Sequence, residues 1–469
     1  MNRRDFLTKS LATTVAASLG GPGLARGANA ATVLPRAKRI IYLFLSGGPS
    51  QQDLYDYKPL LNKHHKEQMF TTGNKKGLIT PKFRLTGMTA TANHPICGTK
   101  YQFKQHGQSG AWLSELLPNV ARAADDICFI KSVHTKHINH DPAVTAIQTG
   151  SQIAGRPSLG AWLSYSLETM NNSLPSYFVM TPTWTGRMPG QPIYSRLWGA
   201  GVLPSNYQGV PIRRSGDPIL YLKNPDAISA AQRSTMVDGV TQLNRLNFER
   251  LRDEEILARS LQVEMAQRMQ SSVPELVDLE QEPQHILDLY GPEVKTSGTF
   301  ANSCLLARRM AERDVRTIQI FHRGWDQHVK LPDHLPKQCN DVDQPIFGLL
   351  TDLKQRGLLE DTLIVCGGEF GRTSYCQGKL DNTTYGRDHH PGCFTVWMAG
   401  GGVKSGYTHG ETDDFSYEIV KDPVSTDDLN ATILHLMGIN HDRLSVKHQG
   451  LDLKLTGVEG ARVVREIIA

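Results

Sequence analysis

Short apolar runs recur along the chain, and most of them end in a turn rich in Gly, Ser, Asp or His. A run that is apolar at nearly every position is typical of a strand buried on both faces of a parallel sheet. We therefore predict strands at six runs: residues 39–45, 126–133, 177–180, 315–321, 362–366 and 394–399.

Segments with helical patterns lie between these runs, and we predict helices at residues 109–124, 157–170, 301–313 and 426–437. Repeated strand, turn and helix units predict an α/β fold, with a mostly parallel sheet that carries helices on both faces. A chain of 469 residues is long enough for one large α/β domain with insertions, or for two domains.

The middle of the chain departs from this alternation. Residues 181–226 are dense in Gly, Pro, Trp and Tyr, which suits either a substrate rim or ordinary packing loops. Residues 238–271 have helical composition, and their apolar positions are spaced for one buried face: Leu243, Leu246, Leu251, Ile256, Leu261 and Met265. A helical hairpin packed on the sheet and a dimer surface both fit this pattern. We interpret residues 31–469 as a single domain with an irregular and helical insertion around 181–290.

The first 30 residues have the pattern of an export signal. Arg3 and Arg4 are followed by Phe6 and Leu7, then by a mildly apolar stretch and a small-x-small cleavage site at residues 28–30. The arginine pair favours the twin-arginine translocase over an ordinary secretion signal. We predict a periplasmic or extracellular bacterial protein, and no later stretch is apolar for long enough to span a membrane.

Net charge and cysteine usage exclude several classes of protein. The formal charge is +5, of which the first 31 residues carry +3, so the remainder is nearly neutral and has no basic stripe for nucleic acid. The seven cysteines are odd in number and lack Cys-x-x-Cys spacing, which argues against a disulfide framework and a zinc ribbon. We predict buried thiols at Cys128, Cys366 and Cys393.

Carboxylates and imidazoles follow the later strands. Asp326 and His328 come after residues 315–321, Glu369 and Arg372 come after 362–366, and His389 lies in the next turn. Oxygen and nitrogen donors just past strand ends can converge on one divalent metal from rigid supports. We predict that Asp326, His328, Glu369 and His389 bind metal. Arg372 either offers donors to a tetrahedral oxyanion or serves as a helix-start or ion-pair arginine.

Two earlier turns carry further candidates. Asp53 follows the turn at residues 46–50 and is either a metal ligand or a helix N-terminal charge. His140 and Asp141 lie at the end of a turn that begins at His134, and we take both as catalytic candidates. Three other residues are expected to lie outside the metal shell or to face solvent: His134, His137 and Asp388.

Six motifs together resemble a known family. They are Leu-Ser-Gly-Gly-Pro-Ser at 45–50, Thr-Gly at 149–150, Arg-Gly-Trp-Asp-Gln-His at 323–328, Gly-Gly-Glu-Phe-Gly-Arg-Thr at 367–373, Gly-Arg-Asp-His-His-Pro at 386–391 and Ala-Gly-Gly-Gly-Val-Lys at 399–404. The set resembles the exported, sulfatase-like family of unknown function in the alkaline phosphatase superfamily. The resemblance implies a three-layer α/β/α sandwich with metals at the carboxyl ends of its strands.

The resemblance also suggests roles for single residues. Asp326 and His328 resemble the family's Asp/His pair, and Glu369 resembles an acidic ligand. His389 resembles the last histidine, with His390 as the alternative. The superfamily usually places an aspartate where this chain has Ser46-Gly47-Gly48, so Asp53 would have to substitute.

The nucleophile region departs further from the superfamily. His140 and Asp141 stand where a Ser, Thr or formylglycine-forming Cys is expected. His140 can bind metal, which is the conservative choice, or attack phosphorus, or act as an acid or base.

The sequence thus predicts a metal-dependent hydrolase of phosphate or sulfate esters in the cell envelope, with an anionic ester such as sulfated polysaccharide as substrate. The alternative is a catalytically degenerate, metal-stabilised binding or envelope protein with the same fold, favoured by the absence of Ser and Cys from positions 139–142. Zn, Mn, Ca and Mg all accept such donors, so the identity of the divalent metal stays open.

Overall fold

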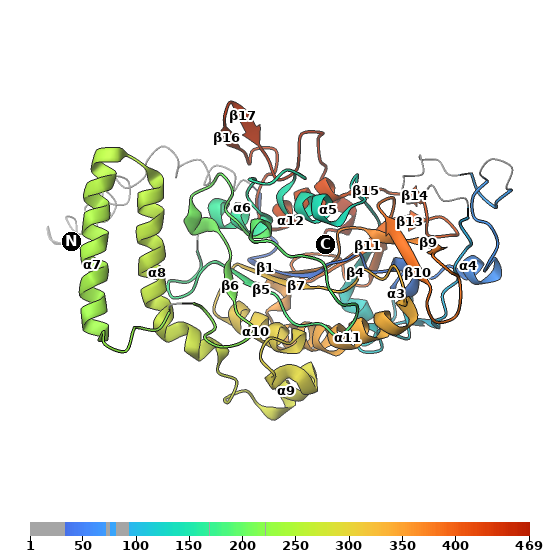
Figure 1. Cartoon of the computed structure of the whole chain (residues 1–469), viewed down its shortest axis with the longest axis horizontal. Coiled ribbons are helices and arrows are strands. Elements are labelled where there is room, and N and C mark those ends of the chain that lie inside the picture. The colour runs from blue at the N-terminus through green and yellow to red at the C-terminus, as the bar shows by residue number, and fades with distance from the viewer. Residues whose placement is uncertain (1–32, 72–75, 81–92, 168, 221) are drawn as a thin grey trace.

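The computed structural model describes residues 33–71, 76–80, 93–167, 169–220 and 222–469 (Figure 1). The predicted export signal at residues 1–30 lies outside the described residues. All six predicted strands form and are largely or wholly buried: β1 (Arg39–Leu45), β4 (Ile127–His134), β5 (Tyr177–Met180), β7 (Thr317–His322), β8 (Thr362–Gly367) and β11 (Phe394–Ala399).

These strands build one central sheet in the order β12-β4-β11-β8-β1-β7-β5-β6, with β15 (Val424–Ser425) also paired to β4. The short strands β12 (Tyr407–His409) and β6 (Val210–Ile212) are the outermost two of that order. All pairs are parallel except those that β11 makes with β4 and β8. The prediction of a mostly parallel sheet is therefore confirmed.

Helices cover both faces of the sheet. Alternate residues of β1 point to opposite faces, so the strand contributes to two hydrophobic cores. Ile41, Leu43 and Leu45 join one hydrophobic core, which includes side chains of α10 (Phe300–Glu312) and α11 (Leu331–Gln355). Ile40, Tyr42 and Phe44 join a second core with α5 (His140–Thr149), α6 (Leu159–Ser166) and α12 (Thr426–Leu436). The two helix layers lie below and above the sheet in Figure 1, so the expected α/β/α sandwich is confirmed.

The helix predicted at residues 109–124 is wrong. The chain instead forms a hairpin of β2 (Phe103–His106) and β3 (Ala111–Ser114), and then a 3-10 helix, η1 (Val120–Asp126). Leu113 and Leu117 are both buried in the same core, one from the strand and one from the turn that follows. Helical spacing therefore identified residues that share one hydrophobic core, but these residues lie on a strand and a turn and not on a helix.

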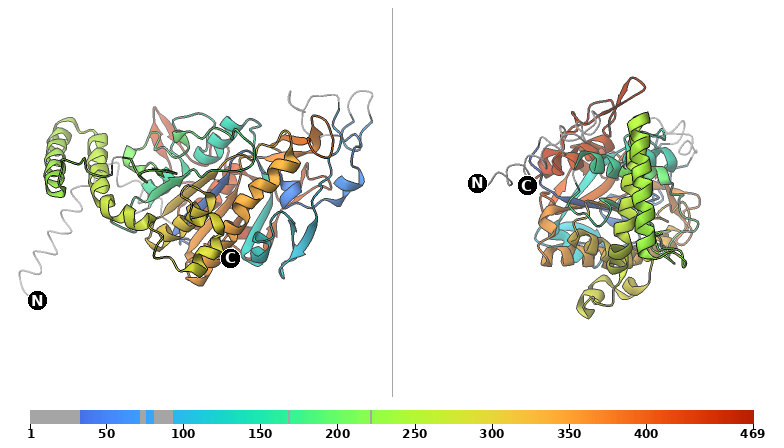
Figure 2. Two further views of the ribbon diagram at one scale, coloured as in Figure 1. Left: turned by 60° about the horizontal axis from the view of Figure 1, so that its bottom comes forward. Right: turned by 90° about the vertical axis from the view of Figure 1, so that its left-hand side faces the viewer.

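The segment 238–271 is part of a helical hairpin formed by α7 (Ala230–Leu251) and α8 (Glu254–Val277). The hairpin stands at one end of the molecule, with α7 outermost (Figure 2). Leu243 and Leu246 are 62% and 63% exposed, so the prediction that they lie on a buried face is wrong. Leu243 and Leu246 are therefore not covered by the central sheet.

The remaining fold-level expectations concern thiols and membrane spans. All seven cysteines are buried and free of disulfides, as predicted for Cys128, Cys366 and Cys393. Among the helices in the described ranges, none combines the length and apolar character needed to cross a membrane.

Candidate metal centre

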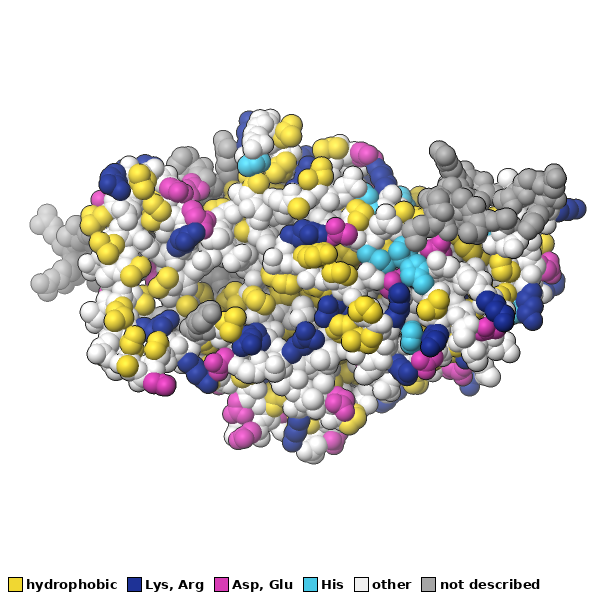
Figure 3. All heavy atoms as spheres, in the orientation of Figure 1, with side chains coloured by type: hydrophobic (Ala, Val, Ile, Leu, Met, Phe, Trp, Pro, Cys, Tyr) yellow, Lys and Arg dark blue, Asp and Glu magenta, His cyan; other side chains and the backbone are white. Residues whose placement is uncertain are grey.

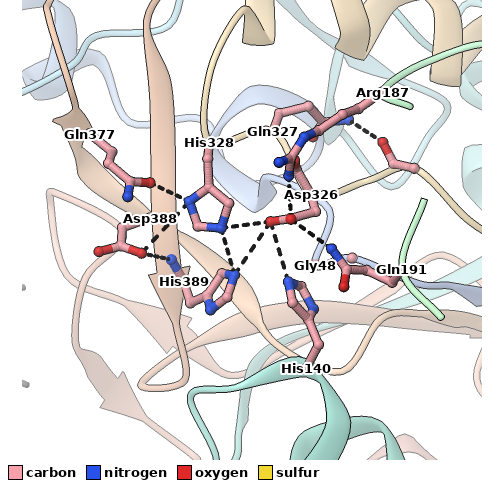
Figure 4. Close-up of polar contacts among 12 residues, drawn as sticks. Gly48, His140, Arg187, Gln191, Asp326, Gln327, His328, Gln377, Asp388 and His389 are labelled. Atoms are coloured by element: carbon pink, nitrogen blue, oxygen red, sulfur yellow. Dashed lines mark hydrogen bonds and ion pairs between the residues drawn. The ribbon is translucent and has the colours of Figure 1, made fainter. Parts of the chain in front are cut away.

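Three histidines and one aspartate, all residue types that can bind a metal, come from three separate segments and meet beside the carboxyl ends of the strands. His140 is the first residue of α5, Asp326 and His328 lie in the loop after β7, and His389 lies in β10 (Gly386–His390). One donor atom from each lies within 4.8 Å of the others (Figure 4). β10 forms a hairpin with β9 (Gly371–Gln377), which brings His389 back beside the loop after β7.

The turn after β1 allows the Asp326 loop to approach. Gly47 has a φ of +125°, and a Cβ there would lie 2.5 Å from the backbone nitrogen of Asp326. Only glycine tolerates both the conformation and the contact. The backbone of Asp326 therefore packs directly against Gly47.

The Nε2 atoms of all three histidines face the same oxygen of Asp326. They lie 2.8 Å (His328), 3.3 Å (His140) and 3.3 Å (His389) from Oδ1. The Nε2 atoms of His328 and His389 are also only 2.8 Å apart. Three nitrogens and one carboxylate oxygen thus surround one small volume.

The opposite ring nitrogen of each histidine contacts an oxygen. Nδ1 of His140 lies 2.6 Å from Oε1 of Glu369, and Nδ1 of His389 lies 2.7 Å from the carbonyl oxygen of Ile138. Nδ1 of His328 contacts Oε1 of Gln377. Because these oxygens accept, we assign the imidazole proton to Nδ1, which leaves the Nε2 lone pairs directed at the cluster. Metal-ligating histidines typically donate their second N–H in this way.

This donor set fits a divalent cation. With protons on Nδ1, no Nε2 has a proton to share, so close lone pairs and a carboxylate oxygen repel one another unless a positive charge lies between them. Burial lowers the pKa of His389 to about 3, with the charge of Arg372 acting in the same sense, so its imidazole is neutral at pH 7. Imidazole nitrogen and carboxylate oxygen are ligands of Zn²⁺ and of related transition metals.

The pKa values of Asp326 and His140 shift in opposite directions, and the contact between the two side chains contributes to both shifts. Burial alone raises the pKa of Asp326, but the charge of Arg372 and the contacts with the three histidines outweigh it and hold this pKa far below its usual range. Burial lowers the pKa of His140, yet its contacts with Asp326 and Glu369 dominate and raise it. The raised pKa reports a negative potential of the kind that attracts a metal cation.

The second oxygen of Asp326 is held by a different segment. Nη1 of Arg187 contacts Oδ2 and the carbonyl oxygen of Asp326, and Nε2 of Gln191 donates to Oδ2 at 2.6 Å. Both residues belong to the irregular stretch at 181–226. The structure thus brings part of this stretch to the rim of the centre, a position that sequence reasoning considered but could not assign to particular residues.

Glu369 lies next to the four clustered residues. Its carboxylate is fully buried and accepts from the backbone nitrogen of Gly47 at 2.9 and 3.1 Å, in addition to its contact with His140. Glu369 lies just after β8, as the sequence predicts. It contacts Nδ1 of His140, on the side of the ring away from the cluster, so we interpret it as a residue that orients this histidine.

Arg372 lies behind Asp326, where no oxyanion can reach its guanidinium. That group is fully buried and donates to Oδ1 of Asp326 at 2.7 Å and to the carbonyl oxygens of Gly47, Gly48 and Arg387. The geometry therefore corresponds to the ion-pair alternative for this arginine.

Two further candidates lie away from the cluster. Asp53 is buried in an ion pair with Arg387, at 2.7 and 3.2 Å, and also accepts from the hydroxyl of Ser50. Asp141 has a side chain that is 65% exposed and pairs with Arg196. The structure therefore does not bring the carboxylate of Asp53 or Asp141 to the metal donors.

Asp388, His134 and His137 are not among the four clustered residues. Oδ1 of Asp388 accepts from the backbone nitrogen of His389 at 2.8 Å, and burial raises the pKa of Asp388. His134 and His137 line a separate cavity of about 360 Å³ with Arg156 and Asp427.

Comparison with known proteins places the chain in a family. The sequence profile described as "Protein of unknown function (DUF1501)" matches residues 37–468. The chain belongs to the DUF1501 family. This match spans the whole sandwich, from the start of β1 to the last buried residues. No curated protein matches the DUF1501 chain.

Solved structures with a similar arrangement come from phosphatases and sulfatases. The PsFucS1 sulfatase from Pseudoalteromonas sp. is 12% identical, with a TM-score of 0.36 and coverage of 96% of this chain and 76% of that one. A protein in the alkaline phosphatase superfamily from Vibrio parahaemolyticus is 9% identical, with a TM-score of 0.37 and coverage of 95% and 78%. Alkaline phosphatase from the Antarctic bacterium TAB5 is 11% identical, with a TM-score of 0.31 and coverage of 86% and 98%. Likeness at this level does not transfer an activity to the DUF1501 chain.

Proposed function

We propose that this chain binds a divalent metal ion through His140, Asp326, His328 and His389, and uses it to hydrolyse phosphate or sulfate esters. The arrangement of the three imidazoles supports the proposal most strongly. Each directs Nε2 to one oxygen of Asp326 and contacts an oxygen acceptor through Nδ1. Core packing gives no reason for three histidines to share this orientation.

The centre is open to solvent on one side. The side chains of His140 and His328 are 15% and 18% exposed, and a group of histidine side chains reaches the surface near the position of β10 (Figure 3). The side chain of Arg187 is 27% exposed beside them. A substrate and a water molecule can therefore approach from this face, and a cationic group meets them there.

The charges of the centre suit an anionic ester. A bound divalent cation would neutralise charge on an ester oxygen and lower the pKa of a coordinated water. The chain itself orients the donors through Glu369, Gln377 and the carbonyl of Ile138. Arg187 adds a second positive charge at the rim, which favours a phosphate or sulfate group over a neutral ester.

The test combines metal analysis with an ester panel. We expect about one equivalent of Zn, Mn or another divalent metal in purified protein, and turnover of an aryl phosphate or aryl sulfate. Asp326→Ala should remove the metal and lower turnover by about 100-fold or more. His285→Gln, at an exposed histidine away from the centre, is the matched control and should change neither. Fully loaded protein that is inert on aryl phosphates, aryl sulfates and sulfated polysaccharides would refute the hydrolase.

A metal-stabilised binding protein is the second candidate. The number of donors favours this candidate. Structural zinc centres have four protein ligands in a tetrahedron, whereas catalytic zinc centres typically have three and a bound water. Its signature in the same experiment is tight metal binding, a large loss of thermal stability on chelation and no turnover.

Export through the twin-arginine translocase is part of the proposal and rests on residues 1–30 alone. Replacing Arg3 and Arg4 with Lys should leave the full-length protein in the cytoplasm. A secreted, processed double variant would show that another export route is used.

A further inference from the structure

The loop at residues 183–191, which we call the strap, is unusually well anchored for an irregular segment. The carboxylate of Asp341 in α11 accepts from the backbone nitrogen and the hydroxyl of Thr185, at 2.7 and 2.6 Å. Oε1 of Gln338, also in α11, accepts from the backbone nitrogen of Gly186 at 2.7 Å. The strap is thus fixed to a long helix of the sandwich.

Packing holds the strap in the same position. The indole of Trp184 donates to the carbonyl oxygen of Arg187 at 2.9 Å, and the guanidinium of Arg323 lies 4.1 Å from its ring. A Cβ on Gly190 or Gly324 would lie 2.7 or 2.5 Å from this indole. The loop therefore closes on its own tryptophan, and its end is directed at the metal centre.

The strap acts on one oxygen of Asp326. Arg187 and Gln191 both contact Oδ2, whereas the three Nε2 atoms face Oδ1. Arg372 also donates to Oδ1, but a carboxylate oxygen has more than one lone-pair direction, so one remains for a cation. The two oxygens of this carboxylate therefore have different partners, and only Oδ1 faces the imidazoles.

We propose that the strap makes Asp326 a one-oxygen ligand and thereby sets the metal preference of the centre. Three imidazoles and one carboxylate oxygen give four donors, the number that Zn²⁺ favours. Mn²⁺ and Mg²⁺ favour more oxygen ligands, which a two-oxygen Asp326 would help to supply. Arg187 and Gln191 are positioning residues in this scheme, and the inference depends on the proposed metal centre.

The experiment measures metal preference rather than turnover. Dissociation constants for Zn²⁺ and Mn²⁺ are obtained by competition with chelators for the wild type, for Gln191→Met and for Thr185→Val. Gln191→Met removes one of the two donors to Oδ2 and leaves Arg187, and Thr185→Val removes a strap anchor that does not touch Asp326. Gln208→Met, at an exposed glutamine in the same irregular stretch, is the matched control.

We expect Gln191→Met to weaken Zn²⁺ binding by about 10-fold while Mn²⁺ binding stays constant or tightens. Thr185→Val should shift the same ratio by about 3-fold, because the other strap anchors remain. The visible absorption of bound Co²⁺ should weaken in Gln191→Met, as expected when a four-coordinate ion gains a ligand. Circular dichroism and thermal melting establish that each variant is folded.

Three outcomes would overturn the inference. Equal losses for Zn²⁺ and Mn²⁺ would mean that the strap only stabilises the site. Unchanged dissociation constants for both ions, or an unchanged Co²⁺ spectrum, would mean that the contacts of Oδ2 are irrelevant to the metal. In both cases the metal centre itself stands, because the wild type binds. Wild-type protein that binds none of these ions would refute the proposed centre together with the inference. If Gln191→Met does not fold, the Thr185→Val ratio decides.

Discussion

Glu369→Gln tests whether Glu369 orients a metal ligand or is one itself. The carboxylate contacts Nδ1 of His140 at 2.6 Å and the backbone nitrogen of Gly47 at 2.9 and 3.1 Å. Glutamine keeps the shape of the side chain but has a single acceptor oxygen and no charge. Both donors reach Oε1, so a glutamine oxygen in that position keeps both contacts without the charge, and the Gly47 nitrogen then faces the new amide group where it now also contacts Oε2.

The size of the effect follows from these contacts. A hydrogen bond to a charged group contributes about 1.5–3 kcal/mol, and its neutral counterpart about 1 kcal/mol. His140 should therefore be held less firmly, and the expected loss in metal affinity is about 10–100-fold, or about 1.4–2.7 kcal/mol. Removing a true ligand, as in His389→Ala, should cost clearly more.

Isothermal titration of metal-free protein with Zn²⁺ measures the difference. Glu360→Gln, at an exposed glutamate within η5 (Leu359–Asp361), controls for the change in net charge and should bind Zn²⁺ as the wild type does. If Glu369→Gln loses as much affinity as His389→Ala, Glu369 is a ligand and our interpretation of its contacts is wrong. If it loses none, His140 does not need this acceptor.

Three other predictions concern stability. Asp53→Asn should leave the metal stoichiometry unchanged but lower the free energy of unfolding in urea by about 3–5 kcal/mol, because Arg387 is left buried without its partner; loss of metal in the folded variant would contradict this. Burial lowers the pKa of His390 to about 4, so the unfolded chain takes up the proton first as pH falls below about 6.5. The contribution of neutral His390 to the free energy of unfolding is complete above that pH and should decrease by about 2 kcal/mol between pH 7 and pH 5 in metal-free protein. The free energy of unfolding of His390→Gln should depend less steeply on pH, and equal slopes for variant and wild type would refute the prediction. Finally, when metal has been removed with a chelator, adding free Zn²⁺ at 100 times its Kd should raise the free energy of unfolding by about 2.7 kcal/mol. A melting temperature that does not respond to Zn²⁺ would argue against a site confined to the folded state.

The central sheet could be predicted because its strands are buried on both faces. In β1 every residue is buried, so the apolar run itself specifies a strand between two helix layers. Residues 109–124 were predicted wrongly because helical spacing can also arise when a strand and a turn supply one core, as Leu113 and Leu117 do. The apolar face of α7 was misjudged for a different reason. Spacing identifies an apolar face, but whether that face is covered depends on tertiary packing, and Leu246 is exposed.

The sequence could locate the metal centre but could not divide the roles within it. Asp326 and Glu369 both follow buried strands, and only the contacts distinguish the carboxylate that faces three imidazoles from the one that orients His140. Arg187 and Gln191 had no sequence signal, because the stretch that contains them has neither periodicity nor a motif. Their positions depend on the neighbouring Trp184 and on helix α11, and α11 lies far from this stretch in the sequence.

The same contacts connect the donor count to the question of catalysis. Because Oδ2 of Asp326 is engaged by Arg187 and Gln191, the carboxylate contributes one oxygen, and a cation would have four protein donors. Zinc centres can expand to five ligands during reaction. The side chains of His140 and His328 are partly exposed, so a fifth ligand can enter from solvent without displacing a protein donor. The positive rim at Arg187 lies beside the same opening and favours an anion there. A four-donor site of this kind is therefore compatible with hydrolysis by water, which needs no serine or cysteine nucleophile.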